Sequence, residues 1–309
     1  MLRNLGPLVL AACATTLWAG SLTAEENTVT PNTKVFENAP QPGAALWQAE
    51  AASGYVGGGA TTFRGANRGD SDAFNFSLQA STRFSLSDKW FMQLGLGSAN
   101  FYLGRVSGAP VPEDIHTLRA EVGLGYRWDE KWTFTALLGP TLYRLEDIDI
   151  NDFGLAGGLL ARYQAKPSLT FSVGVMVAPD SDVKAMPLVG VRWLINDHYT
   201  LEVGMPKTRL SYRLQPKWAL YAGLDLNGST FRTSERFGTD TGFSRYNNAL
   251  ATYRDLRLGV GTGYEFARGL RVEVEAGVSV YHEIYYSRIA EQVSFDPAAY
   301  VRIGLNGRF

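Results

Sequence analysis

From Ala49 to the C-terminus, apolar and polar residues alternate along successive short segments of the chain. The segment LRVEVEAGVSV (270–280) places leucine, valine and alanine on one side, and arginine, glutamate, glycine and serine on the other. RAEVGLGYRW (119–128) and YVRIGLNGRF (300–309) alternate in the same way. Because successive side chains of a strand point to opposite faces, these segments predict strands with one apolar and one polar face.

The connections between these segments alternate in length. Short turns are expected at 85–89, 129–131, 165–168, 196–198, 215–217 and 267–269, and longer polar links at 64–73, 103–115, 145–152, 179–184, 229–250 and 287–297. Only 205–207 is short where a long link is due. Outer-membrane barrels have tight periplasmic turns and longer outer loops. The pattern therefore predicts an all-β fold, a transmembrane antiparallel up-and-down barrel of about fourteen strands, or of twelve if 199–214 is not a hairpin.

Composition narrows the class of protein. The net charge is −1, so nothing in the bulk charge points to nucleic acid as a partner. No apolar run of membrane-helix length follows the N-terminal region, so the sequence predicts no internal membrane helix. The mean hydropathy of −0.10 is compatible with barrel strands, whose alternating residues average out.

The N-terminal region has the features of a secretory signal. Arg3 precedes an uncharged apolar stretch that ends near Ala24, so we expect a signal peptide over 1–24. A proline-containing periplasmic tail (25–48) and a barrel (49–309) would follow. Cys13, the only cysteine, lies inside the signal; the alternative is a lipobox, in which Cys13 would be acylated.

Aromatic residues cluster beside the expected short turns: Trp90, Trp128, Trp132, Trp193 and Trp218. They predict an interface girdle, where amphipathic rings lie at the level of the lipid headgroups. The chain ends on Phe309, with Val301, Ile303 and Leu305 on the same side of the last segment. This ending resembles the C-terminal assembly signal of Gram-negative outer-membrane proteins, although Gly307 replaces the usual large apolar residue.

The region after the signal resembles bacterial outer-membrane β-barrel proteins as a whole. The stretch MPKTRLSYRLQPKWALYAGLDLNG (205–228) is similar to an uncharacterised family of such barrels, a domain of unknown function. The resemblance implies the bacterial outer membrane, with lipid, lipopolysaccharide, the barrel assembly machinery and periplasmic chaperones as partners. It implies no known activity and no catalytic residues.

Many charged residues fall on the polar face, which points into the lumen of a barrel: Arg119, Glu121, Arg127, Arg162, Arg192, Glu202, Arg209, Arg213, Asp225, Arg257, Glu265, Arg271, Glu273 and Glu275. Either they pair with one another and hold the shape of the lumen, or the arginines form a constriction that favours anions. Inward glycines such as Gly123, Gly125, Gly259 and Gly261 would leave room in the lumen or relieve strain.

We therefore expect a passive pore for small hydrophilic solutes, which would be anionic solutes if the arginines form a cationic constriction. The alternative is a closed structural or loop-presenting barrel. A lipid-active enzyme at the rim is a third hypothesis. Ser279, His282 and Glu283 are the candidate residues, but neighbouring strand residues face opposite ways. We expect no enzyme activity and no cofactor. We also expect no metal site, because the histidines are far apart in the sequence.

Overall fold

The computed structural model describes residues 45–145, 148–181 and 184–309. Its strands are β1 (Ala45–Phe63), β2 (Ala66–Ser85), β3 (Trp90–Leu103), β4 (Asp114–Arg127), β5 (Trp132–Leu142), β6 (Phe153–Lys166), β7 (Leu169–Val177), β8 (Ala185–Leu194), β9 (Tyr199–Val203), β10 (Lys207–Gln215), β11 (Trp218–Arg232), β12 (Leu250–Ala267), β13 (Leu270–Tyr286), β14 (Glu291–Phe295) and β15 (Ala298–Arg308). Three short helices are η4 (Ile150–Asp152), α3 (Phe237–Asp240) and η5 (Ser244–Tyr246). In this part of the chain, no helix is long and apolar enough to cross a membrane.

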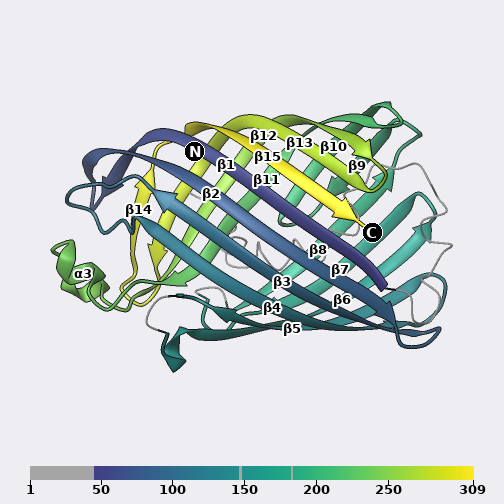
Figure 1. Cartoon of the computed structure of the whole chain (residues 1–309), viewed down its shortest axis with the longest axis horizontal. Helices are drawn as coiled ribbons and strands as arrows, with labels where there is room; N and C mark the ends of the chain where they lie inside the picture. The colour runs from purple at the N-terminus through teal and green to yellow at the C-terminus, as the bar shows by residue number, and fades with distance from the viewer. Residues whose placement is uncertain (1–44, 146–147, 182–183) are drawn as a thin grey trace.

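The strands form one closed antiparallel sheet (Figure 1). From β1 to β14, each strand pairs with its neighbour in sequence, and β15 closes the ring by pairing with β13 and with β1, the latter from Gln48↔Arg308 to Val56↔Tyr300. The short β14 and β15 follow one another between β13 and β1, so together they make a single interrupted strand. The barrel therefore has fourteen strands, as predicted. Because β9 and β10 form a hairpin, the twelve-strand alternative is wrong.

The connections divide the barrel into two ends. The turn end carries the connection 86–89, the five other tight turns and the C-terminus, and lies at the right of Figure 1. The loop end carries the long connections, including 104–113 and 233–249, together with α3 at the left of the same view. The predicted segregation of connections by length holds for most of the chain.

Two of the expected long links contain strand instead. The link 64–73 is a two-residue turn at Arg64 and Gly65, followed by the start of β2. Both residues have positive φ angles (51° and 76°), which is the geometry of a tight turn between twisted strands. The link 287–297 contains β14, whose Val293 and Phe295 are buried. Their polar neighbours hid these strand extensions in the sequence.

The first strand begins at Ala45, four residues before the expected start of the barrel. Residues 45–48, assigned to the tail from the sequence, therefore belong to β1. Trp47 is among them, and its side chain is exposed on the outer surface. The expected signal peptide (1–24), the rest of the tail and Cys13 lie outside the described residues.

The outer surface of the barrel is apolar. Residues that alternate outward along the strands, such as Leu96, Val173 and Val260, are exposed leucines and valines. Trp90, Trp128, Trp132, Trp193 and Trp218 are also exposed, and each stands beside a connection at the turn end. Trp90 contacts Tyr126 with ring centroids 4.7 Å apart, and Trp132 contacts Tyr163 at the same separation. The outward face is thus a broad apolar band with aromatic rings at one edge.

The barrel wall is interrupted between β8 and β11. β8 pairs with β7 from Ala185 to Trp193 but with β9 only from Val191 to Leu194. β11 pairs with β12 along its whole length but with β10 only as far as Asp225. The β9–β10 hairpin is therefore shorter than its neighbours. Above its tip, β8 and β11 are not joined by a strand.

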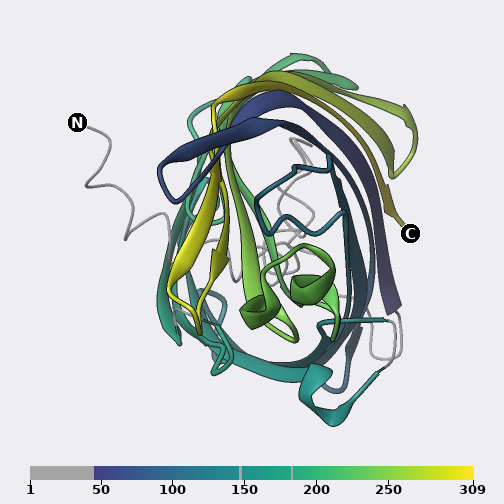
Figure 2. The same ribbon diagram turned by 90° about the vertical axis from the view of Figure 1, so that its left-hand side faces the viewer.

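Beyond this tip, β11 and β12 turn into the interior. The outward side of β11 carries Leu224, which is 41% exposed, and then Leu226, which is 8% exposed. Leu226 packs against Met176, Met186 and Leu188 on the inner sides of β7 and β8. In Figure 2, viewed from the loop end, the green ribbons of β11 and β12 run inside the ring of the other strands. In the loop-end half of the barrel, β11 and β12 therefore form an inner layer inside the other strands.

Candidate functional site

Paired charges line the middle of the interior and its turn-end part. Arg119 contacts Glu121 on the same strand at 3.1 Å, and Arg192 on β8 contacts Glu202 on β9 at 3.4 Å. Arg302 on β15 reaches Glu50 on β1 at 3.0 Å. Each of these pairs brings an inward arginine within salt-bridge distance of a carboxylate. Such an arrangement resists the loss of either member, because an unpaired charge would remain in the wall.

Arg209 is at the centre of the largest cluster. Its guanidinium lies 3.4 Å from Glu273 and 3.7 Å from Glu275, and it stacks 3.6 Å from the centroid of the Tyr221 ring. Arg271 also contacts Glu273, at 3.2 Å. The cluster joins β10, β11 and β13 across the wall.

The other predicted lumen charges lie nearer the turn end or in the middle of the barrel. Arg127 donates to the backbone oxygen of Asp88 at 3.1 Å, and Arg213 to that of Asp197 at 2.8 Å. Glu265 accepts from the backbone N–H of Gly269 at 3.2 Å. Arg162 lies between Thr133 of β5 and Ser172 of β7 in the ladders. These residues are not brought together into one ring.

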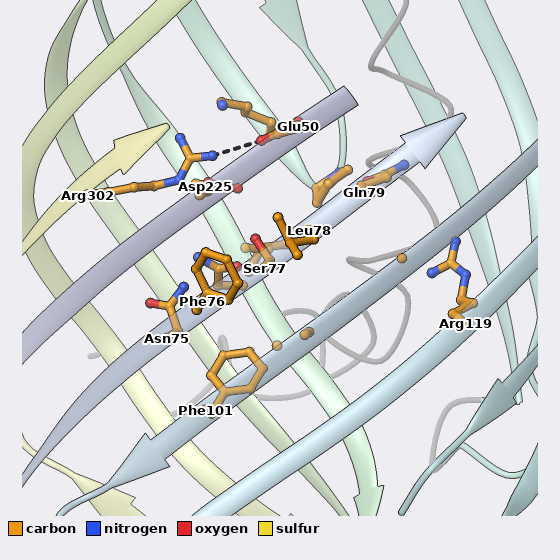
Figure 3. Close-up of a pocket in the computed structure, with 18 of the residues that line it drawn as sticks. Glu50, Asn75, Phe76, Ser77, Leu78, Gln79, Phe101, Arg119, Asp225 and Arg302 are labelled. Carbon is orange, nitrogen blue, oxygen red and sulfur yellow. Dashed lines mark hydrogen bonds and ion pairs between the residues drawn. The ribbon is translucent and has the colours of Figure 1, made fainter. Parts of the chain in front are cut away.

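A cavity of about 140 Å³ lies halfway along the interior, and we call it the central chamber (Figure 3). Strands β1 to β4 form one side of it, with polar groups from Asn75, Ser77 and Gln79. β15 and the outer halves of β10 and β11 complete it, and its charged lining residues are Glu50, Arg119, Glu121, Lys207, Asp225 and Arg302. Of the predicted lumen charges, the chamber therefore gathers Arg119, Glu121 and Asp225.

The interior glycines do not leave empty space. A Cβ atom on Gly125 would overlap the ring of Phe91, and one on Gly261 would overlap the ring of Tyr221. The hydroxyl of Tyr300 occupies the corresponding place at Gly259. In these cross-strand contacts the absent side chain is replaced by an aromatic ring from the same face. The expectation that these glycines open the lumen is wrong for all three positions.

The loop-end half of the interior is filled by an apolar core. Val56 and Phe63 of β1, Phe101 of β3, Tyr253 of β12 and Ile284 of β13 all belong to one buried cluster. The connection 104–113 folds inward and adds Val106, Ala109 and Val111 to it. An interior of this kind excludes water, because packed side chains leave few voids as large as a water molecule.

Side chains from several connections fasten this core. Tyr286 donates from its hydroxyl to the backbone oxygen of Pro110 at 2.5 Å, which holds the inward-folded connection 104–113. Tyr246, buried in η5, contacts the Tyr286 ring with centroids 4.7 Å apart. Its hydroxyl donates to Glu291, which also contacts Arg245 at 2.5 Å. Burial and the neighbouring Glu291 carboxylate raise the pKa of the Tyr246 hydroxyl, so Tyr246 remains a neutral donor.

Asp152 forms a second contact that stabilises the connections, and it was not predicted from the sequence. Its carboxylate is fully buried and lies 2.9 Å from Arg144 and 3.3 Å from Arg232. Arg232 also donates to the backbone oxygens of Asn151 (2.8 Å) and Asn248 (3.0 Å). Asp152 thereby links the β5–β6 connection to the β11–β12 connection. Nearby, burial raises the pKa of Tyr143 to about 12. Arg144 and Asp152 lie in a connection and Arg232 at the end of β11, where the alternation has stopped, so no pattern in the sequence marked them.

Arg254 and Glu283 were also missed. Both side chains are fully buried and form an ion pair at 2.7 Å. They stand on the outward sides of β12 and β13, and the inward roll of these strands removes them from the surface. Arg254 was a signal available in the sequence, because it continues the outward phase of β12, where a side chain would otherwise face lipid. Glu283 reaches the outward side of β13 only through the register shift in the β12–β13 pairing between Leu256 and Arg257.

The proposed serine–histidine–acid set is not assembled. The Ser279 hydroxyl donates to Asp255 at 2.5 Å, and Asp255 accepts from Arg257 at 2.7 Å. His282 stacks on Phe295 with centroids 4.3 Å apart, while Glu283 faces the opposite side of the sheet. Among the described residues, no group of three or more His, Cys, Asp or Glu side chains could hold a metal ion.

The last strand is exposed as the sequence pattern predicts. Val301, Ile303, Leu305 and Phe309 lie on the outer surface. The Phe309 backbone exchanges two hydrogen bonds with Trp47, of 3.0 and 2.9 Å, at the closure between β15 and β1. These residues therefore stand at the junction where the barrel closes.

The protein is therefore a fourteen-stranded antiparallel β-barrel with an apolar exterior and a charged and apolar interior. The sequence model of the family described as Domain of unknown function (DUF6268) matches residues 73–308. The chain belongs to this family. No curated protein matches it.

Several solved structures share the arrangement at low similarity. A TodX deltaS2S3 mutant monoaromatic hydrocarbon channel is 11% identical, with a TM-score of 0.48 over 92% of this chain and 94% of that chain. The COG4313 outer membrane channel from Pseudomonas putida F1 is 12% identical, with a TM-score of 0.44 over 87% and 97%. A Pseudomonas aeruginosa FadL homologue is 10% identical, with a TM-score of 0.43 over 96% and 98%. Likenesses this weak carry no argument about the activity of this chain.

Proposed function

We propose that this protein is a bacterial outer-membrane channel that is closed at its loop end and opens when the inward-folded connections move. Membrane placement is supported by the apolar outer band, the tryptophans beside the turn end and the closed ring of strands. Apart from the interruption beyond the β9–β10 hairpin, a closed barrel leaves no sheet edge in lipid, where unpaired backbone groups are costly. In this arrangement the turn end, with its tight connections, lies in the periplasm and the long connections lie outside the cell.

The observation that carries the proposal is the change of lining along the interior. The central chamber is polar and charged, whereas the loop-end half is an apolar core that includes the connection 104–113. A small polar solute can occupy the chamber but cannot cross the core as it stands. The open passive pore therefore requires a second conformation, in which this connection leaves the barrel.

The paired interior charges favour a second candidate, a permanently closed structural barrel. Arg119, Arg192 and Arg302 are each within 3.4 Å of a carboxylate. Paired arginines form a weaker anion filter than free ones. If the network and the core never rearrange, the outer connections become the functional surface, and lipopolysaccharide is the partner to consider.

Conductance in planar bilayers distinguishes these functions. We expect the wild-type protein to be silent or to open rarely, and a variant with residues 105–112 replaced by a short Gly-Ser linker to show steady steps. Retained heat-dependent gel mobility of both proteins serves as the folding control. Silence of both folded proteins would support the structural barrel, and steady steps from the wild type would contradict the closed loop end. A salt gradient across the bilayer would report ion preference.

A further inference from the structure

The interruption of the barrel wall between β8 and β11, which we call the seam, indicates a specific class of ligand. We propose that the seam between β8 and β11 receives the alkyl chain of a single-chain amphiphile from the bilayer, while its small zwitterionic head lies in the central chamber between Lys207 and Asp225. This inference rests on the membrane placement proposed above. It does not require that the barrel conduct ions.

The seam lies at membrane depth. The β9 strand runs for five residues from Tyr199, which stands beside the turn end, so it spans roughly 17 Å at about 3.3 Å per residue. The hydrocarbon layer is about 30 Å thick. The tip of the β9–β10 hairpin therefore falls within this layer. Val189, Val203 and Leu224, which surround the tip, are exposed on the outer surface, so the seam is continuous with the lipid-facing band.

Adaptable apolar side chains close the seam. Met176, Met186, Leu188 and Leu226 form one buried cluster, and Met205 at the hairpin tip packs against it. Methionine has an unbranched, flexible side chain that repacks around differently shaped partners at low cost. A seam closed by three methionines is therefore suited to admit an alkyl chain in place of side-chain contacts.

The seam and the chamber share a boundary. Leu226 belongs to the seam cluster and also lines the chamber. Pro206, which follows Met205 in the chain, lines the chamber too. The Leu226 backbone N–H donates to the Pro206 oxygen at 2.9 Å. Ligand pockets for drug-sized molecules are usually about 300–1,000 Å³, so a chamber of about 140 Å³ holds only a small group. A long ligand must extend out of the chamber, and the seam is the adjoining apolar route.

The charges at this boundary indicate the head group. Lys207 and Asp225 lie opposite one another in the β10–β11 ladder, and both line the chamber. In the described part of the chain, neither makes a hydrogen bond or ion pair through its side chain, whereas Arg302 and Arg119 are each paired with a glutamate. An ammonium group would complement Asp225, and a neighbouring phosphate or carboxylate would complement Lys207.

Photolabelling tests this assignment. The purified protein in vesicles is exposed to lysophosphatidylethanolamine with a diazirine in its acyl chain, irradiated and analysed by peptide mass spectrometry. We expect labelling of the β7–β8 and β11 residues of the seam, competed by unlabelled lysophosphatidylethanolamine. Labelling confined to outer-surface residues such as Val189 and Val203 would overturn the proposal.

Two variants test the head group. Lys207→Met and Asp225→Asn should each weaken competition about tenfold, the loss expected for one charged hydrogen bond. Lys207→Arg should retain most of it, and Lys217→Met, in a turn-end connection, serves as the matched control. Equal labelling of the seam by a headless alkyl diazirine, or unchanged competition in folded Lys207→Met and Asp225→Asn, would overturn the proposal. Because labelling needs no ion current, its failure is distinguishable from a failure to conduct.

Discussion

Leu224 and Leu226 stand two residues apart on the same side of β11, yet Leu224 faces outward and Leu226 is buried against β7 and β8. No change in residue type separates the two environments. The difference arises because β10 ends its pairing at Asp225, so the strand is free to turn inward at that point. This inward turn of β11 creates the seam, the boundary of the central chamber and the inner layer formed by β11 and β12.

Substitution of each leucine by alanine should distinguish the two environments. Leu226→Ala should lower the free energy of unfolding by about 2–5 kcal/mol, because it removes buried methyl groups and leaves a cavity. Leu224→Ala should lower it by only about 1 kcal/mol, since lipid replaces the lost contacts. Denaturant titration of the folded, heat-modifiable gel band measures both. Equal losses would show that Leu226 also faces lipid.

The buried carboxylate of Asp152 should hold the outer connections together. Asp152→Asn keeps the size of the side chain but leaves Arg144 and Arg232 without their shared counter-charge, and breaking such a buried pair costs about 3–5 kcal/mol. We expect faster amide hydrogen exchange on both sides of the linkage, in β5–β6 and β11–β12 connections. Asp240→Asn is the control, because its contact with Arg236 is exposed. Unchanged exchange in Asp152→Asn would exclude a fastening role.

The cross-strand contact between Gly125 and Phe91 predicts a compensating pair of substitutions. Gly125→Ala should destabilise the barrel, because the new methyl group would overlap the Phe91 ring. Gly97→Ala is the matched control, since its nearest neighbour would be the Leu78 backbone oxygen at 3.7 Å, an ordinary contact. Adding Phe91→Leu to Gly125→Ala should recover part of the loss. Thermal unfolding of the wild type, Gly125→Ala, Phe91→Leu and the double variant gives the coupling, and purely additive effects would exclude a role for the ring.

The sequence predicted the class, the strand number and the inward or outward phase of most positions. Periodicity is a local property, and ten residues suffice to read it. The ends of the strands were less predictable, because β2 begins within a polar segment that looks like a loop. Trp47 illustrates the same limit: a tryptophan of the outer surface lay in a stretch read as tail.

The inward roll could not be derived from periodicity. It depends on the pairing of strands that are distant in sequence, and only Arg254 hinted at it by placing a charge in the outward phase. The filled interior was hidden for a related reason. Connection 104–113 is polar in part and proline-containing, and its burial depends on Tyr286, which lies far along the chain.

Phe309 has an aromatic ring and a backbone that pairs with Trp47, and two variants should separate the effects of the two. Deleting Phe309 removes both backbone hydrogen bonds to Trp47 together with the aromatic ring, whereas Phe309→Ala removes the ring alone. If the ring is read by the assembly machinery, Phe309→Ala should lower the amount of folded protein in the outer membrane nearly as much as the deletion does. Refolding from urea into detergent, where no machinery is present, should then be normal for Phe309→Ala and impaired only for the deletion. A Phe309→Ala protein that assembles normally in cells would mean that Phe309 contributes only through its backbone at the closure of the barrel.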